Sequence, residues 1–173
     1  MTAYAPSPTA APSPLAHPRL PQAALVLASV GALGTALLSQ YVGGLHPCEF
    51  CIWQRWAYVA AIVALLPGLA NPRFRTASLV LGGLAFLAGA AIAGFHAGVE
   101  QHWWEGFTTC SSSMPKNLTL DQLRERLLSA PLVRCDEAQW TFHGISMAAF
   151  NFPASLILGL VAWAAARAGA KRA

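Results

Sequence analysis

Four long apolar stretches alternate with polar segments along the chain. They cover residues 23–41, 51–70, 77–95 and 147–166. A helix that spans a membrane needs roughly 20 mostly apolar residues. The pattern therefore predicts an all-α membrane protein, a four-transmembrane-helix bundle over residues 23–168. The stretches are also rich in Gly, Ala and Ser, which let neighbouring helices approach closely.

The polar segments between these stretches differ in length. Residues 42–50 form a short loop after the first span, and residues 96–146 form a long loop before the last. Within the long loop, Thr119-x-x-Gln122 matches a capping box and opens the segment "TLDQLRERLL", whose leucines recur on one helix face. We expect a short amphipathic helix here, lying either on the membrane surface or packed within the loop.

The two ends of the chain lie outside the spans. Residues 1–22 are rich in Pro, Ala and Ser, which predicts a disordered tail. They lack the basic start, short apolar core and cleavage site of a signal peptide, so the first span is expected to stay as a membrane anchor. Residues 169–173 form the second tail.

Charged residues are scarce and unevenly placed. Only 10% of the residues are charged and the mean hydropathy is +0.47, whereas soluble domains carry about 25% charged residues. All 7 acidic residues fall in the two loops described above. The tails and the turn between the second and third spans carry no acid, and their basic residues are Arg19, Arg73, Arg75, Arg167, Lys171 and Arg172.

This segregation predicts the orientation of the chain. Lys and Arg in short loops mark the cytoplasmic side of a membrane, so both termini are expected in the cytoplasm. The loops at 42–50 and 96–146 are then expected in the periplasm of a bacterium, at its inner membrane. Because the net charge of +4 largely reflects this topology, we expect no binding to nucleic acid.

The 4 cysteines all lie on the side of the membrane predicted to be outside the cytoplasm. Cys48 and Cys51 stand where the short loop meets the second span, and Cys110 and Cys135 stand in the long loop. Disulfides persist in the periplasm. The placement therefore favours thiol–disulfide chemistry on that side.

Cys48, Cys51 and Arg55 are spaced i, i+3 and i+7, which is one stripe of a helix. A helix N-terminus and a nearby cation both stabilise a thiolate, so Cys51, closer to Arg55, is the expected activated thiol. Cys48 is expected to be the more exposed and to exchange with another loop. A charged residue at membrane depth is costly and usually functional. The alternative for Arg55 is a side chain that reaches the lipid headgroups.

Other functions remain possible for these cysteines. A zinc site would need Cys110 and Cys135 as further ligands, but their spacing is not that of a second metal knuckle, so no metal is expected. Covalent haem attachment requires His directly after the second Cys, where this chain has Ile52. Two alternatives stay open: a non-enzymatic four-helix scaffold with structural disulfides, and a small quinone- or lipid-binding subunit with incidental cysteines.

The stretch "PCEFCIWQR" resembles the C-x-x-C-x-x-x-R signature of the disulfide bond formation protein B (DsbB) family, which are bacterial inner-membrane thiol oxidases. The resemblance extends from Ala23 to Ala166. It includes four spans, a cysteine pair in each outer loop, and "CDEAQWTFHGISMAAFN" leading into the last span.

The resemblance implies a relay of disulfides. Cys110–Cys135 would oxidise a periplasmic thioredoxin-fold protein of the DsbA type, and Cys110 would form the mixed disulfide. Cys135 would then exchange with Cys48 of a Cys48–Cys51 disulfide. Cys51 would pass electrons to membrane quinone, expected to be ubiquinone in preference to menaquinone. Arg55 would stabilise both the thiolate and the reduced quinone oxygen.

Family members often carry a histidine near the quinone, at the outer end of the third helix. Here "FHAGVEQHWW" offers His96, Gln101 and His102. The resemblance makes His96 and His102 candidates for quinone binding without choosing between them. Alternatively, His96 is a polar residue at a helix end, and His102 is an interfacial residue beside tryptophans typical of an aromatic belt.

Overall fold

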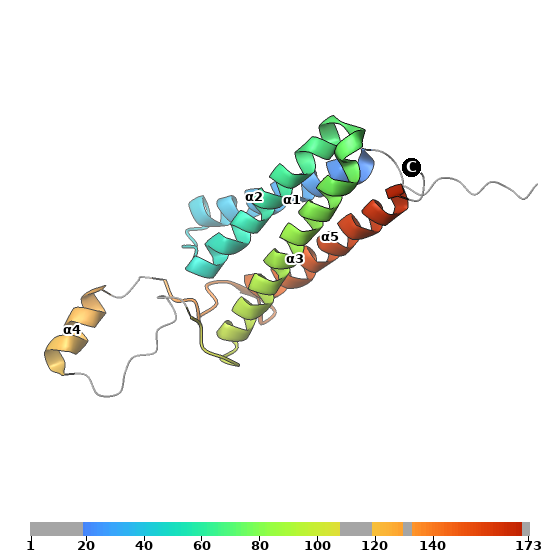
Figure 1. The fold of residues 1–173 in the computed structure, drawn as a ribbon. Coiled ribbons are helices and arrows are strands. Elements are labelled where there is room, and N and C mark those ends of the chain that lie inside the picture. Colours follow the sequence, from blue (N-terminus) through green and yellow to red (C-terminus); the bar gives the residue numbers. More distant parts are fainter. Residues whose placement is uncertain (1–18, 108–118, 130–132, 171–173) are drawn as a thin grey trace, which may run out of the picture.

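The computed structural model describes residues 19–107, 119–129 and 133–170. The described residues form a bundle of four long helices (Figure 1): α1 (Leu20–Tyr41), α2 (Glu49–Ala70), α3 (Arg75–Glu100) and α5 (Met147–Ala170). A 3₁₀ turn, Pro72–Phe74, joins α2 to α3, and the short helix α4 covers Leu120–Ser129. Each of the four long helices is long and apolar enough to cross a membrane. The expected all-α four-helix membrane architecture is therefore confirmed.

The helices extend beyond the apolar stretches that predicted them. α1 begins at Leu20 because Pro21 fits the first turn of a helix, where no intrahelical N–H is needed. α3 continues to Glu100, past the expected end near Phe95. The extra turn brings His96 and Glu100 into the helix, where both side chains point into the bundle.

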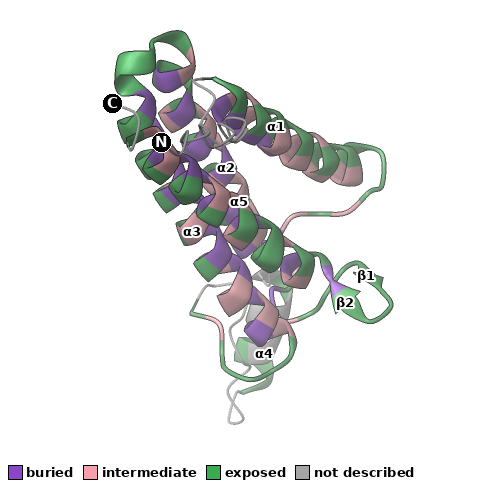
Figure 2. Cartoon of the chain, turned by 90° about the vertical axis from the view of Figure 1, so that its right-hand side faces the viewer, coloured by how far each residue is buried: buried purple, intermediate pink, exposed green. Residues whose placement is uncertain are grey.

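The third helix is the centre of the bundle. α3 packs against both α2 and α5, whereas α1 packs mainly on α2 and makes little contact with α5. Glycines allow α3 and α5 to lie close together, since a Cβ added at Gly159 would meet the Gly83 carbonyl oxygen at 3.3 Å. Figure 2 shows the buried residues on the faces where the helices meet. The weak α1–α5 contact leaves room for a cavity.

A short hairpin, which the sequence did not predict, precedes α5. Strands β1 (Thr141–Phe142) and β2 (Ile145–Ser146) pair antiparallel. His143 and Gly144 both have positive φ, at 50° and 79°, as a tight type I′ turn requires. The hairpin places Ser146 at the start of α5, where its Oγ accepts a hydrogen bond of 3.1 Å from the Ala149 N–H.

The capping box at the start of α4 is present. The Thr119 N–H donates to Gln122 Oε1 at 3.1 Å, and the Gln122 N–H donates to Thr119 Oγ1 at 3.4 Å. The short helix is thereby confirmed, and its position on a membrane surface stays a prediction. Cys110 and most of the expected tails, at 1–18 and 171–173, lie outside the described residues.

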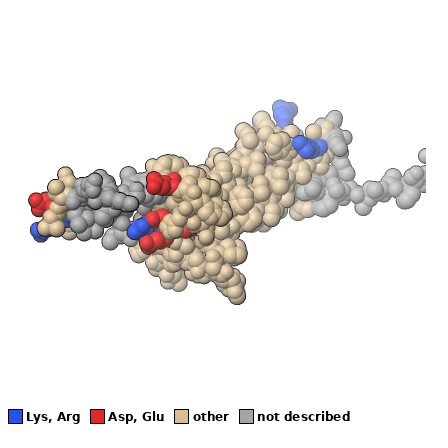
Figure 3. Space-filling view, turned by 90° about the horizontal axis from the view of Figure 1, so that it is seen from below, with Lys and Arg blue, Asp and Glu red and all other residues tan. Residues whose placement is uncertain are grey.

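Charge distinguishes the two ends of the bundle. Acidic side chains gather at the end that carries Cys48 and Cys51, here called the cysteine end, with some basic side chains among them, whereas the opposite end shows basic side chains without acidic ones (Figure 3). Arg73, Arg75 and Arg167 belong to that opposite end. The segregation seen along the sequence is therefore also a segregation in space.

Candidate functional site

Cys48 caps the helix that carries Cys51. α2 begins at Glu49, and the Cys51 N–H donates a hydrogen bond of 3.3 Å to Cys48 Sγ. The two sulfurs lie 3.0 Å apart and both cysteines are free thiols. A disulfide needs a separation of about 2 Å, so a small side-chain movement would close this pair.

The expectation that Cys48 is the more exposed cysteine is wrong. Its side chain is buried, with 5% exposed, and Cys51 is only half-buried. Capping turns the Cys48 sulfur inward, where it packs with Phe50 and Val99. The thiol donates to the Cys51 sulfur, and this contact together with burial raises the pKa of Cys48.

Cys135 joins the same buried cluster as Cys48. It is fully buried and disulfide-bonded. Its neighbours Arg134 and Asp136 form a two-point ion pair, with N–O distances of 3.0 and 2.6 Å, which lowers the pKa of the Asp136 carboxyl. The structure thus places a cysteine of the long loop and a cysteine of the short loop in one buried cluster, and the exchange between them stays a prediction.

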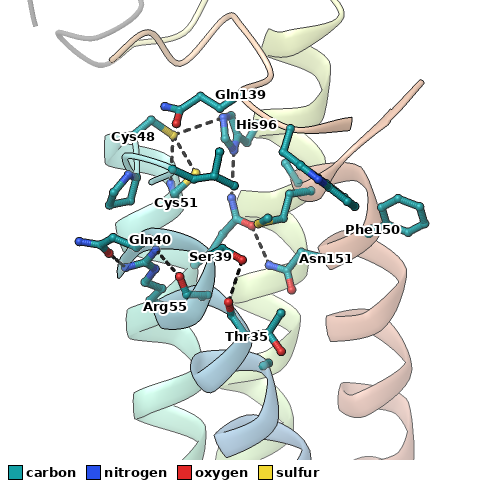
Figure 4. A pocket seen from close by; sticks show the side chains of 18 of the residues that line it. Thr35, Ser39, Gln40, Cys48, Cys51, Arg55, His96, Gln139, Phe150 and Asn151 are labelled. Atoms are coloured by element: carbon teal, nitrogen blue, oxygen red, sulfur yellow. Dashed lines mark hydrogen bonds between the residues drawn. The ribbon is translucent and has the colours of Figure 1, made fainter. Parts of the chain in front are cut away.

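His96 is the histidine that the fold brings to the cysteines (Figure 4). It lies in the last turns of α3 with 2% of its surface exposed, and its Nε2 is 3.5 Å from Cys48 Sγ. The ring is also hydrogen-bonded to the backbone of Cys135. Gln101 and His102 are exposed, and His102 has a positive φ of 57° just beyond the helix end. Of the three residues in question, only His96 reaches the site.

Glu100 was not singled out from the sequence. Its carboxylate is 7% exposed, lies 3.6 Å from His96 Nε2, and accepts a hydrogen bond from Ser146 Oγ. An acid one helical turn after a histidine was the signal available. This spacing could not be recognised as significant, because the predicted third span ended before both His96 and Glu100.

A second group of polar residues lies below the cysteines and was also missed. Gln54 Nε2 is 3.1 Å from His96 Nδ1, and Gln54 Oε1 accepts a bond of 2.6 Å from Asn151 Nδ2. The Tyr58 hydroxyl donates to Asn151 Oδ1 at 2.6 Å. The available signal was weak: single amides within the apolar helices α2 and α5.

Arg55 faces α1. Its guanidinium donates to Gln40 Oε1 at 2.5 Å and to the Ala36 carbonyl oxygen at 3.2 Å. These contacts hold the cation between two helices rather than extended toward headgroups. The positive charge therefore lies inside the bundle, on the side of α2 that carries the cysteines.

A cavity of about 330 Å³ opens beside these residues. Its polar lining comprises Cys48, Cys51, Gln54, Arg55, Tyr58, His96, Glu100 and Asn151. Apolar side chains of α1 and α5, such as Leu33 and Phe150, form the opposite walls. Ligand pockets of roughly 300–1,000 Å³ with a few polar groups are typical of small-molecule sites. The cavity could hold a flat ring between a thiol and a fixed cation.

The same residues offer donors for a metal ion. The sulfurs of Cys48 and Cys51 and a ring nitrogen of His96 lie within 4.8 Å of one another. Thiolate and imidazole suit zinc. The two thiols can instead close a disulfide, and the two outcomes exclude each other. This set differs from the zinc set considered from the sequence, which drew on Cys110 and Cys135.

The fold and site define a class of protein. It is a multi-pass membrane protein in which a cysteine pair at the start of one helix lies beside a cysteine of a second loop and beside a cavity with polar residues. Over residues 18–165 the chain matches the family model described as "Disulfide bond formation protein DsbB". The chain belongs to the DsbB family.

Individual relatives agree with this assignment. A protein of Albidiferax ferrireducens named "Disulfide bond formation protein B" is 30% identical over 153 residues, which cover 83% of each chain. One of the same name from Shewanella frigidimarina is 30% identical, covering 84% of this chain and 88% of its own. An uncharacterized protein of Rickettsia prowazekii is 26% identical, covering 78% and 79%. No solved structure gave a significant match.

Proposed function

We propose that this protein is a quinone-dependent thiol oxidase that reoxidises a periplasmic thioredoxin-fold protein of the DsbA type. Membership of the DsbB family supports a role in disulfide bond formation. The observation that carries the finer proposal is the single cavity lined by Cys51, Arg55 and His96, directly beside Cys48.

The first step takes place in the long loop. A Cys110–Cys135 disulfide accepts two electrons from the dithiol of the soluble partner, passing through a mixed disulfide on Cys110. One disulfide breaks here and one forms in the partner, so thiols and disulfides balance. The burial of Cys135 supports attack at Cys110, because a soluble partner cannot reach a sulfur with no exposed surface.

The second step moves the disulfide between loops. The Cys135 thiolate attacks Cys48 of a Cys48–Cys51 disulfide, a Cys48–Cys135 bond forms, and Cys51 leaves with the electron pair. The shared packing of Cys48 and Cys135 in one buried cluster supports this exchange.

The last step uses the cavity. A bound quinone supplies a two-electron acceptor, and we expect ubiquinone in preference to menaquinone. Arg55 would hold it and stabilise negative charge on its oxygen, because a fixed cation in a water-poor site does so strongly. Cys51 faces the cavity beside that cation. Before this step, the Cys110 thiolate attacks Cys135 of the Cys48–Cys135 bond, so that Cys110–Cys135 re-forms and Cys48 is released as a thiol. Cys48 and Cys51 then lose two electrons and two protons as their disulfide closes, and the quinone would take these up to become quinol.

The proposal requires the cysteine end to face the periplasm, across a bacterial inner membrane. Reporter fusions at the Asn71 turn and the C-terminus should therefore report cytoplasm, and fusions near Asn117 should report periplasm. The basic side chains at the opposite end of the bundle support this orientation. A cytoplasmic reporter at Asn117 would contradict it, since the thiols would then face a reducing compartment.

Purified protein provides the direct test. A reduced thioredoxin-fold partner is mixed with the protein and with ubiquinone or menaquinone, and quinol is followed by its absorbance. We expect one quinol for each disulfide formed in the partner, with faster turnover on ubiquinone. Oxidation of the partner without quinol formation would contradict the proposal. Cysteine pairs that never change redox state would indicate a structural scaffold.

A further inference from the structure

A chain of hydrogen bonds runs across the bundle toward Cys48. Tyr58 and Gln54 of α2 bracket Asn151 of α5, and Gln54 in turn contacts His96 of α3. The distances are 2.6 Å from the Tyr58 hydroxyl to Asn151 Oδ1, 2.6 Å from Asn151 Nδ2 to Gln54 Oε1, and 3.1 Å from Gln54 Nε2 to His96 Nδ1. Figure 4 shows His96 above Asn151 at the cavity wall.

The chain has a direction. In the structure the Tyr58 hydroxyl donates to Asn151 Oδ1 at 2.6 Å, and the Ser155 hydroxyl lies 3.3 Å from that oxygen and 3.0 Å from the Tyr58 oxygen. Asn151 therefore turns its Nδ2 toward Gln54. Gln54 must receive that bond on its oxygen, so its Nε2 faces His96.

This direction determines the tautomer of His96. An amide nitrogen donates and does not accept, so Nδ1 of His96 must accept from Gln54. In a neutral imidazole the other nitrogen then carries the proton. Turning Gln54 alone would break two hydrogen bonds in a setting of low dielectric, where unpaired polar groups are costly.

The protonated nitrogen faces the cysteines. His96 Nε2 lies 3.5 Å from Cys48 Sγ and 3.6 Å from Glu100 Oε1. The sulfur of Cys48 is buried beside that of Cys51, which disfavours a negative charge, and the Cys51 N–H at 3.3 Å is a donor that favours one. The ring is also hydrogen-bonded to the Cys135 backbone, so Cys48 Sγ shares the His96 N–H with that group and would draw it more strongly once it carries a negative charge.

We infer that Gln54 and Asn151 are positioning residues that hold His96 with its Nε2–H directed at Cys48. The inference rests on the proposed function, because the exchange step that this hydrogen bond would assist belongs to that function. When Cys110 attacks Cys135 of a Cys48–Cys135 disulfide, the Cys110–Cys135 bond re-forms and Cys48 leaves with the electron pair. No net oxidation occurs in this exchange. A hydrogen bond from His96 speeds it, because a better-stabilised thiolate leaves faster.

The reactivity of Cys48 tests whether Gln54 acts through His96. In a Cys51→Ser background with the long-loop disulfide intact, Cys48 is the thiol left to react with an alkylating probe. His96→Phe should slow its alkylation at neutral pH by about tenfold, the effect of losing one hydrogen bond to a charged group. Gln54→Leu should slow it in the same direction but by less, because the ring then carries its proton on Nε2 only part of the time. Asn151→Leu should slow the alkylation of Cys48 less than Gln54→Leu does, since Gln54 is still present to donate to the His96 ring.

Combining the two substitutions gives the decisive comparison. The double variant Gln54→Leu with His96→Phe should be no slower than His96→Phe alone, because Gln54 then has nothing to position. Ser29→Ala, which removes a buried hydroxyl bonded to the Leu25 carbonyl outside the cavity, should keep the parent rate. Full additivity of Gln54→Leu and His96→Phe would overturn the inference.

The tautomer can be observed directly. ¹⁵N NMR of protein labelled at histidine, with the His96 signals assigned by their loss in His96→Phe, should show a proton on Nε2 and none on Nδ1. Gln54→Leu should give a mixture of both tautomers. A wild-type ring protonated on Nδ1 would overturn the inference. Neither the alkylation rates nor the NMR spectra depend on the partner or on quinone. A negative result in them therefore does not contradict the proposed oxidase activity. Conversely, a failure to form quinol does not contradict the direction of the hydrogen bonds.

Discussion

Cys135→Ser is expected to accumulate a stable mixed disulfide with the soluble thioredoxin-fold partner, and Cys110→Ser is expected to form none. In the first variant Cys110 can still attack, but the thiol that would resolve the complex is gone. In the second the attacking sulfur is missing. Quinone-coupled turnover should fall to background in both. Non-reducing gels of membranes treated with reduced partner measure the trapped species.

The buried position of Cys135 supplies the physical reason for this order. Its side chain has no exposed surface and packs with Cys48, so it is suited to an exchange inside the protein rather than with a soluble one. A complex that formed through Cys135 in the absence of Cys110 would show that the order of attack is reversed. Cys48→Ser serves as the matched control, since it should leave the first mixed disulfide unaffected.

Arg55→Met is expected to lower quinone-coupled turnover by about 100-fold or more, the usual effect of removing one group that stabilises developing negative charge. Arg55→Lys should lose roughly tenfold, because lysine keeps a charge but lacks the planar fork. That fork now spans Gln40 and the Ala36 carbonyl of α1. Turnover measured against quinone concentration separates a loss of binding from a loss of rate.

Both Arg55 variants should still insert and should still form Cys110–Cys135 when an external oxidant is supplied. Arg167→Met is the matched control, since Arg167 lies at the opposite end of the bundle, over the Trp163 ring at 5.3 Å. It should keep wild-type turnover. Wild-type turnover in Arg55→Met would leave Arg55 as a structural link between α1 and α2, and another group would have to stabilise the reduced quinone.

Sequence reasoning succeeded where the physical cause is local. A spanning helix is determined by a run of apolar residues, so the four spans could be recognised without knowing what they contact. The α4 capping box is also local, since Thr119 and Gln122 are one helical turn apart. The same applies to the stripe of Cys48, Cys51 and Arg55, which follows from helix geometry alone, although its catalytic role stays a proposal.

The tertiary structure decided everything that depends on contacts between distant segments. The sequence predicts that Cys48 is more exposed than Cys51, yet Cys48 is buried in a cluster with Phe50, Val99 and Cys135. The choice of His96 over His102 depended on where α3 ends, and a hydropathy pattern places helix ends poorly when a polar turn continues the helix.

By itself, the sequence determined the membrane class, the number of spans and the placement of the thiols in two loops. The physical reason is that hydrophobic length and charge segregation act on each segment separately. Only the folded chain decided that Gln54, His96 and Asn151 meet. Hydrogen bonds between α2, α3 and α5 depend on how the helices rotate against one another, and small residues such as Gly83 and Gly159 set that packing through contacts that no single segment contains.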